Sequence, residues 1–110
     1  MKIAVVGSRT IQTVPLEKFL PPQCTEIVSG GARGVDTVAE RYAKEHGIKL
    51  TVFYPNYERY GKAAPLKRND QIAEYADMVY AFWDGVSRGT LHTVRQCRAL
   101  GKPYRVFRSI

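Results

Sequence analysis

Short apolar runs alternate with helical patterns along the chain, and this alternation restricts the fold more than any other feature. Runs of strand length, rich in β-branched and aromatic residues, occupy residues 2–7, 25–30, 48–54, 77–83 and 103–107. Strands that alternate with helices form parallel sheets, because a parallel pair needs a long crossover connection. The sequence therefore predicts an α/β fold, a Rossmann-like three-layer sandwich whose five-stranded parallel sheet carries helices on both faces.

Four segments between these runs combine the apolar spacing of amphipathic helices with residues that begin or end helices. They cover about residues 13–20, 35–46, 65–76 and 91–100. Thr13 and Thr90 are the expected N-caps of the first and last helix. Pro21 should end the first helix. Gly47 and Gly101 supply the left-handed conformation that commonly ends a helix, here the second and the fourth.

Length and composition fit one soluble domain that spans residues 1–110. Of these residues 45% are hydrophobic and 25% are charged. No apolar run approaches the roughly 20 residues that cross a bilayer, so we expect no membrane partner. The apolar start leads into Gly7 and Arg9 without a small-residue cleavage site, which indicates a strand and not a signal peptide.

The cysteines and histidines predict neither a disulfide nor a metal site. Cys24 and Cys97 form no CxxC pair, which favours structural roles in a reducing cytoplasm. His46 and His92 have no partner at metal-ligand spacing. His46 is expected to cap the end of a helix. His92 has either a structural role or, as the alternative, a contact with a ligand. We therefore expect no metal and no cofactor.

In an open parallel sheet, ligands bind outside the carboxyl ends of the strands, where the strand order reverses. The loops expected at this edge are residues 7–9, 30–34, 54–64 and 84–90. Three of them are rich in glycine or small polar residues, and each of these three contains one arginine: Arg9, Arg33 and Arg88. Arg68, early in the third helix, is expected close to the same edge. The pattern predicts a site for an anion.

The stretch IVSGGARGVD, residues 27–36, is the clearest candidate for that site. Its glycines let main-chain N–H groups approach an anion at the start of a helix. Arg33 would add charge-assisted, bidentate hydrogen bonds to a phosphate. A tight turn that needs glycine only for geometry is the alternative. Asp36 either favours the helix dipole or accepts a hydrogen bond from a ribose hydroxyl.

Two common nucleotide-binding fingerprints are absent from the sequence. GxGxxG does not follow the first strand, and GxxxxGK[ST] does not occur. The sequence therefore argues against a hydride-transferring Rossmann enzyme and against a P-loop NTPase.

Four motifs, VVGSR, SGGARGVD, LKRN and SRGTLHT, occur in this order along the chain. Together they resemble a SLOG domain, and within it the small cpYpsA-related, YspA-like branch. The superfamily includes the lonely-guy phosphoribohydrolases, which release a base from a nucleoside monophosphate. It also includes the DNA-processing protein A group, whose loop GLARGID is similar to residues 30–36. The resemblance implies a nucleotide or nucleotide-derived ligand at the carboxyl edge of the sheet.

The resemblance also implies roles for individual residues. Gly30, Gly31, Gly34, Gly89 and Thr90 would hold phosphate, and Arg68 would match an arginine in a helix motif of the phosphoribohydrolases. With the loop residues above, the candidate ligand-binding residues are Gly7, Ser8, Arg9, Gly30, Gly31, Arg33, Gly34, Asp36, Arg68, Asn69, Arg88, Gly89 and Thr90. For Ser8 and Thr90, helix capping is the alternative role.

No catalytic residue is assigned. The phosphoribohydrolases follow their second glycine loop with GTxxE, whereas Gly89 and Thr90 are followed here by Leu91, His92 and Thr93. A missing carboxylate argues against glycosidic cleavage, because neither histidine nor threonine offers a negative charge to an oxocarbenium-like transition state. Asp36 or Asp84 is the alternative source of that charge.

Three functions follow from these observations. The leading hypothesis is a domain that binds or senses a nucleotide-derived ligand such as AMP or ADP-ribose. The alternative is an N-glycosidic phosphoribohydrolase that acts on a nucleoside monophosphate. The second alternative is a module that binds single-stranded nucleic acid.

Charge and aromatic residues bear on the partners. With 17 basic and 10 acidic residues the net charge is +7, which favours anionic partners. Basic side chains gather near the C-terminus, where they could follow a phosphate backbone or form a solvated face: Arg95, Arg98, Lys102, Arg105 and Arg108. Tyr54, Tyr57 and Tyr60 could stack on a base, pack in the core or lie in a homodimer interface. A homodimer is the working hypothesis for the assembly.

Overall fold

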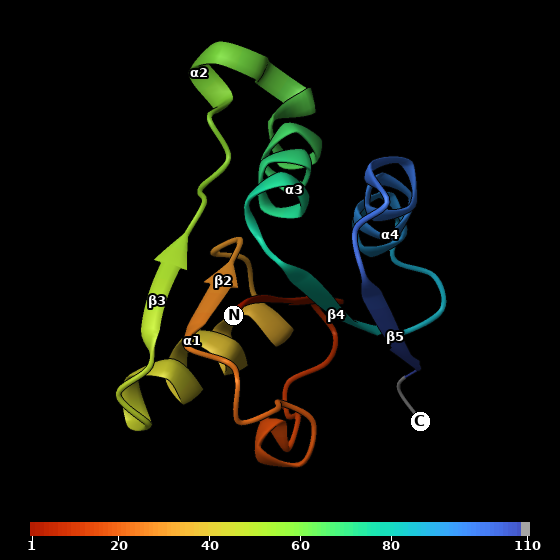
Figure 1. Ribbon diagram of the computed structural model, residues 1–110. Helices are drawn as coiled ribbons and strands as arrows, with labels where there is room; N and C mark the ends of the chain where they lie inside the picture. Colours follow the sequence, from red (N-terminus) through yellow and green to blue (C-terminus); the bar gives the residue numbers. More distant parts are fainter. Residues whose placement is uncertain (109–110) are drawn as a thin grey trace.

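The computed structural model describes residues 1–108 and places five strands in one sheet (Figure 1). All neighbouring strands run parallel, in the order β3-β2-β1-β4-β5. The strands are β1 (Lys2–Gly7), β2 (Glu26–Ser29), β3 (Lys49–Val52), β4 (Met78–Trp83) and β5 (Tyr104–Arg108). Each lies within one residue of a predicted run or inside it. The predicted parallel sheet is confirmed.

Helices cover both faces of this sheet, as the three-layer prediction requires (Figure 1). The α-helices are α1 (Val35–Glu45), α2 (Tyr57–Tyr60), α3 (Ala64–Tyr75) and α4 (Arg88–Leu100). Two short 3-10 turns accompany them, η1 (Leu16–Lys18) and η2 (Gly61–Ala63). α1 and η1 lie on one face, and α3 and α4 lie side by side on the other.

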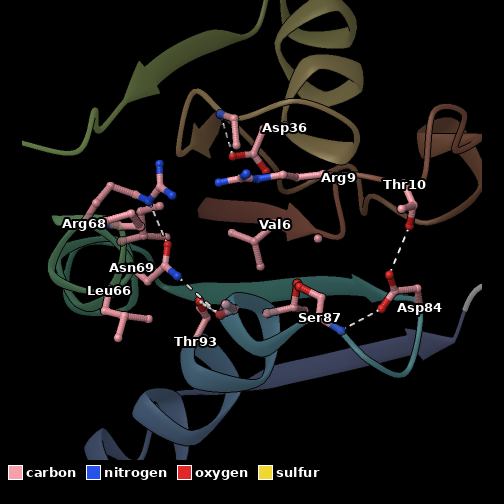
Figure 2. A pocket seen from close by; sticks show the side chains of 16 residues that line it. Val6, Arg9, Thr10, Asp36, Leu66, Arg68, Asn69, Asp84, Ser87 and Thr93 are labelled. Carbon is pink, nitrogen blue, oxygen red and sulfur yellow. Dashed lines mark hydrogen bonds between the residues drawn. The ribbon is translucent and has the colours of Figure 1, made fainter. Parts of the chain in front are cut away.

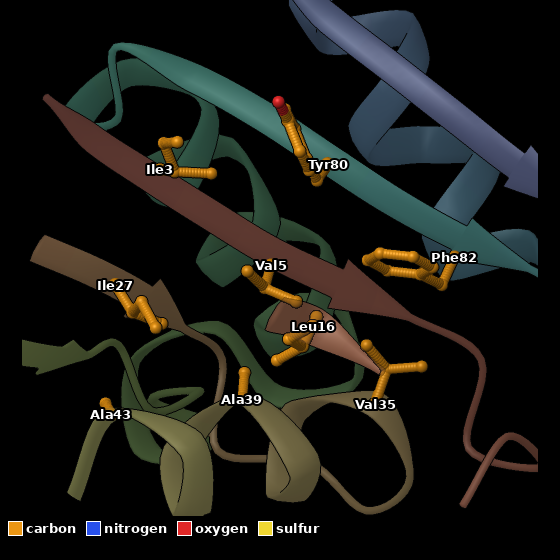
Figure 3. Close-up of a cluster of buried hydrophobic side chains, with 9 residues drawn as sticks. All are labelled: Ile3, Val5, Leu16, Ile27, Val35, Ala39, Ala43, Tyr80 and Phe82. Atoms are coloured by element: carbon orange, nitrogen blue, oxygen red, sulfur yellow. The ribbon is translucent and has the colours of Figure 1, made fainter. Parts of the chain in front are cut away.

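Each face of the sheet has its own core, because successive side chains of a strand point to opposite sides. Figure 3 shows the first core, which joins strand residues to η1 and α1: Ile3, Val5, Leu16, Ile27, Val35, Ala39, Ala43, Tyr80 and Phe82. The second core lies beneath α3 and α4 and contains Ala4, Val6, Val28, Ile72, Ala73, Ala76, Val79, Ala81 and Cys97. Small side chains, four of them alanines, make up much of this second core.

The prediction of a helix over about residues 13–20 is wrong in its extent. Thr13 does not cap it, because only a 3-10 turn forms, with Pro15 at its N-cap position and no side-chain cap. Prolines at 15 and 21 leave five residues between them, and Pro21 disfavours helical backbone at the preceding Leu20. Too few residues remain for an α-helix.

Two other boundaries differ from the predictions. α4 begins at Arg88, with Ser87 in place of Thr90 as its N-cap, because the carboxylate of Asp84 organises the turn just before it. The expected loop over residues 54–64 contains α2 and η2, where the side chain of Asn56 accepts a hydrogen bond from the main-chain N–H of Arg59 at 3.1 Å. The predicted ends of the second and fourth helices hold, since Gly47 and Gly101 both have positive φ.

Strand order reverses beside β1. The chain runs outward from β1 through β2 to β3 and then returns to place β4 on the other side of β1. The loops after β1 and β4 therefore diverge to opposite faces, and such a divergence opens a crevice at the carboxyl edge. Within residues 1–108, none of the helices is both long and apolar enough to cross a membrane.

Candidate functional site

A hollow of about 380 Å³ lies at this crevice, between the ends of β1 and β4 and the first turns of α3 and α4 (Figure 2). Its volume is at the lower end of the roughly 300–1,000 Å³ typical of small-molecule sites. Polar residues from four segments line it: Arg9, Thr10, Asp36, Arg68, Asn69, Asp84, Ser87, Thr90 and Thr93. Its apolar wall consists of Val6, Pro65, Leu66 and Ile72. We call this space the main hollow.

Arg68 enters the main hollow from α3 and is buried. Its Nε donates to Oδ1 of Asn69 at 2.7 Å, and its Nη1 donates to the carbonyl of Gly30. Burial lowers the pKa of this guanidinium, and the nearby Asp36 carboxylate opposes that shift. Nδ2 of Asn69 in turn donates to the carbonyl of Gly89 at 3.2 Å. Arg68 and Asn69 therefore link the glycine-rich loop after β2 to the first turn of α4.

Asp36 lies in the first turn of α1 and is buried behind the glycine-rich loop. Its Oδ2 accepts hydrogen bonds from the main-chain N–H groups of Gly30 at 3.1 Å and Ala32 at 3.2 Å. Burial raises the pKa of Asp36 to about 6, although these amides and Arg68 act in the opposite direction. The side chain is therefore a carboxylate at neutral pH, held by the loop.

In this arrangement protein oxygens already accept hydrogen bonds from the amides of the expected phosphate cradle. The amide of Gly31 donates to Oγ of Ser29 at 3.3 Å, so three consecutive amides of the loop bind protein oxygens. A Cβ atom on Gly30 would lie 2.8 Å from Nη1 of Arg68 and 2.9 Å from Oδ2 of Asp36. Glycine is thus required here for the approach of two protein side chains. A ligand phosphate would reach the amides of Gly30 and Ala32 only by displacing Asp36.

The first turn of α4 presents a different set of amides. Among the hydrogen bonds of residues 1–108, none is donated by the main-chain N–H groups of Arg88, Gly89 or Thr90. Gly89 and Thr90 line the main hollow, so this N-terminus opens onto it. Oγ of Ser87 lies 3.2 Å from Oγ1 of Thr90, which places two hydroxyls beside these amides. Unpaired amides at a helix N-terminus favour an anion.

Asp84 fixes the position of that turn. Its Oδ1 accepts from the main-chain N–H groups of Val86 at 2.9 Å and Ser87 at 2.8 Å, and its Oδ2 accepts from the hydroxyl of Thr10 at 3.0 Å. These hydrogen bonds lower its pKa to about 2. Its own N–H donates to Oγ of Ser8 at 3.0 Å, so the loops after β1 and β4 are joined twice.

Arg9 completes the charged end of the main hollow. Figure 2 shows its side chain extending from the loop after β1, beside Asp36 and toward Arg68. Neither arginine has an ion-pair partner within 4.0 Å among residues 1–108. Two such guanidinium groups therefore line this end, where Asp36 is the nearby buried carboxylate, and the positive charge suits an anion.

The structure divides the predicted site residues into four groups. Those that line the main hollow are Gly7, Arg9, Asp36, Arg68, Asn69, Gly89 and Thr90. Ser8, Gly30 and Gly31 lie outside its lining and make the hydrogen bonds that shape it. Arg33 and Gly34 line an adjoining hollow, and Arg88 is exposed and lines neither.

Some residues of the main hollow were not among the predicted ones. They include Thr10, Ala32, Pro65, Leu66, Ser87 and Thr93. Thr10 and Ser87 are polar residues in strand-end loops, a position that could have identified them. The position three residues after Thr90 is where the resembling hydrolases carry glutamate. Here Thr93 occupies it, and its hydroxyl donates to the carbonyl of Gly89 at 3.1 Å.

Three of the basic residues near the C-terminus, Lys102, Arg105 and Arg108, have partners within the protein. Nζ of Lys102 donates to carbonyls at the end of α3, including that of Glu74 at 3.1 Å. The guanidinium of Arg105 lies 5.7 Å from the ring centre of Phe107, and that of Arg108 lies 5.6 Å from the ring of Trp83. No group of three or more metal-ligating side chains occurs within residues 1–108.

Comparisons with known proteins agree with the sequence motifs. The model of the YspA, cpYpsA-related SLOG family matches residues 1–60. Gene 61 protein of Mycobacterium phage D29 is 36% identical over 83 residues, which cover 70% of this chain and 66% of the phage protein. The chain therefore spans about two thirds of the length of that relative. No solved structure matches.

Proposed function

Because the chain belongs to the YspA, cpYpsA-related SLOG family, we propose that it binds a nucleotide-derived ligand such as AMP or ADP-ribose in the main hollow. Family membership suggests a nucleotide-related function. The relative from Mycobacterium phage D29 carries a name that indicates no activity. The choice of ligand and of site therefore depends on the geometry.

One observation carries the proposal. The unpaired amides of Gly89 and Thr90 and the guanidinium groups of Arg9 and Arg68 belong to the same hollow, and the unpaired amide of Arg88 precedes those two amides in the same helical turn. Each good hydrogen bond to a charged group contributes about 1.5–3 kcal/mol, and a helix N-terminus adds up to about 1 kcal/mol. Two or three such contacts are enough for micromolar binding of a phosphate.

The rest of the main hollow suits a nucleoside. Val6, Pro65, Leu66 and Ile72 form an apolar wall on which a base can pack. The ionised carboxylate of Asp84 can accept a hydrogen bond from a ribose hydroxyl, because its low pKa keeps it an acceptor. Phosphate, sugar and base therefore each have a chemically matched part of one hollow.

Two variants at one position test the role of the α4 amides. Arg88→Pro should weaken AMP binding about tenfold or more, because it removes one free N–H from the first helical position. Proline fits there, since it is favoured at that position and the preceding Ser87 is extended, with φ −61° and ψ 121°.

Arg88→Ala is the matched control. It removes the exposed side chain and keeps the amide, so AMP affinity should change little. Isothermal titration calorimetry measures the AMP affinity of both variants. If both variants weaken AMP binding equally, the side chain of Arg88 and not its amide binds AMP. If the wild-type protein binds neither AMP nor ADP-ribose, the proposal is refuted.

N-glycosidic hydrolysis is the second candidate function, favoured by the two carboxylates of the main hollow. Asp36 has a pKa of about 6, and Asp84 has a pKa of about 2. Carboxylates whose pKa values are driven apart are typical of acid–base pairs. Release of free base from AMP, lost in Asp36→Asn, would support this function. Absence of base release at high protein concentration would exclude it for that substrate.

A further inference from the structure

A second hollow of about 530 Å³ adjoins the main one. It is lined by residues of the loop after β1 and of one face of α1: Arg9, Thr10, Gln12, Arg33, Gly34, Thr37, Val38 and Arg41. The two hollows share Arg9 and Thr10. We call this second space the arginine hollow.

We propose that the arginine hollow binds a second phosphoryl group of the same ligand, which makes the ligand a nucleoside diphosphate or an ester of one. This inference rests on the proposed function, because it takes the first phosphate to lie in the main hollow.

Charge is the first argument. Arg9, Arg33 and Arg41 line the arginine hollow, and its lining contains no acidic residue. The ion pairs found within residues 1–108 are Lys49–Glu26 and His92–Asp70, so the three arginines have no carboxylate within 4.0 Å. Three guanidinium groups that line one hollow without a counter-charge favour an anion there.

Local structure explains why these residues line one hollow. Gly34, Thr37, Val38 and Arg41 are spaced three or four residues apart and therefore share one face of α1. A Cβ on Gly34 would lie 2.7 Å from Cα of Arg9, so the loop after β1 packs directly against the start of the helix. The arginines thus project from two segments whose backbones are in contact.

Neutral donors complete the arginine hollow. Thr10, Gln12 and Thr37 line it, and hydroxyl and amide groups of this kind donate readily to phosphate oxygens. Arg41 also borders a third, more acidic hollow that contains Glu17 and Glu45, without an ion pair to either. Neither Glu17 nor Glu45 lines the arginine hollow, so its own lining carries only positive and neutral side chains.

The position of Arg9 connects the two hollows. Its side chain extends toward Arg68 in the main hollow, yet the residue also lines the arginine hollow (Figure 2). A single ligand with two neighbouring phosphoryl groups can therefore contact Arg9 with both. A nucleoside monophosphate leaves Arg33 and Arg41 without an anion.

Calorimetric titration with AMP and ADP tests this inference. ADP should bind the wild-type protein about tenfold or more tightly than AMP, since one added charge-assisted contact gives a gain of that size. Arg33→Ala and Arg41→Ala should each reduce ADP affinity toward that of AMP and leave AMP affinity unchanged. Lys44→Ala is the matched control, because Lys44 is an exposed cation on the same helix outside the three hollows.

The outcomes separate the two proposals. The second subsite would be overturned if the wild-type protein bound AMP and ADP with equal affinity, or if the arginine variants lost affinity for both nucleotides equally. Neither result would contradict binding in the main hollow. Loss of ADP affinity in Lys44→Ala as large as in Arg41→Ala would also overturn it, since net charge alone would then explain the effect. If neither nucleotide binds, the proposed function and the second subsite both fail.

Discussion

The carboxylate of Asp36 accepts a hydrogen bond from the main-chain N–H of Gly30 at 3.1 Å, so the glycine-rich loop already binds an anion that belongs to the protein. The loop resembles a phosphate site because it performs the same task for a side chain. This internal pair holds the start of α1 against the end of β2, and we therefore propose the first turn of α4 as the place for an external anion.

Stability should depend on pH through Asp36. Its pKa in the folded protein is raised to about 6 from an ordinary value of 3.8, so the fold favours the protonated acid. The stability linked to protonation is fully present below about pH 4, is lost as the pH rises toward 6, and stays lost above it. Its size should be roughly 1–3 kcal/mol. Asp36→Asn removes this titration.

Urea denaturation of both proteins between pH 4 and pH 7 provides the measurement. The free energy of unfolding of the wild type should fall relative to that of the variant across this range. A difference between the two proteins that does not change with pH would mean that the buried carboxylate titrates normally.

Gly34→Ala should destabilise the fold by more than about 2 kcal/mol. Gly34 has φ 76° and ψ −126°, and an added Cβ would lie 2.7 Å from main-chain atoms of Arg9. Gly101→Ala is the control, because Gly101 is left-handed at φ 67° and ψ 24° with open space around it. That variant should lose only about 1–2 kcal/mol. Equal losses in thermal or chemical unfolding would show that no steric clash occurs at Gly34.

Tyr75→Phe should destabilise the protein at neutral pH by about 1–3 kcal/mol. Burial raises the pKa of Glu26, yet hydrogen bonds from Tyr75, Thr51 and Lys49 together lower it below its ordinary value. The hydroxyl of Tyr75 lies 2.5 Å from Oε2 of Glu26. A lowered pKa gives stability that is present above the unfolded pKa and lost as the pH falls through the folded one. The loss of unfolding free energy caused by Tyr75→Phe should therefore become smaller at acidic pH.

Tyr104→Phe serves as the comparison for this experiment. Among the hydrogen bonds of the described residues, none involves the hydroxyl of Tyr104, so its removal should change stability little. Unfolding at neutral pH and at about pH 3 distinguishes the two tyrosines. A Tyr75 variant whose cost is the same at both pH values would contradict the role of Glu26.

The fold was predictable because its signals are local and repeated. β1 and β4 are continuous apolar runs, as expected of strands that are buried on both faces, and the sequence predicted both nearly to the residue. The failures lie where one contact decides a boundary. Asp84 moves the start of α4 from Leu91 to Arg88 through its hydrogen bond to Ser87, and no periodicity in the sequence contains that information.

The site was predictable as an edge of the sheet but not in its details. Strand ends identified the loops of Arg9 and Thr90, which do meet in the main hollow. The sequence could not distinguish an amide that faces solvent from one that a side chain such as Asp36 already binds. It also could not give side-chain direction, and so Arg33 and Arg88 were grouped with Arg68 although they lie outside that hollow.

Amide chemical shifts in a titration with AMP test the central claim most directly. In ¹⁵N–¹H spectra, the amides of Arg88, Gly89 and Thr90 should move in a saturable way as the phosphate binds to the first turn of α4. The amides of Gly30 and Ala32, which Asp36 holds, should stay in place. Saturable shifts at Gly30 and Ala32 with none at the three α4 amides would contradict the account.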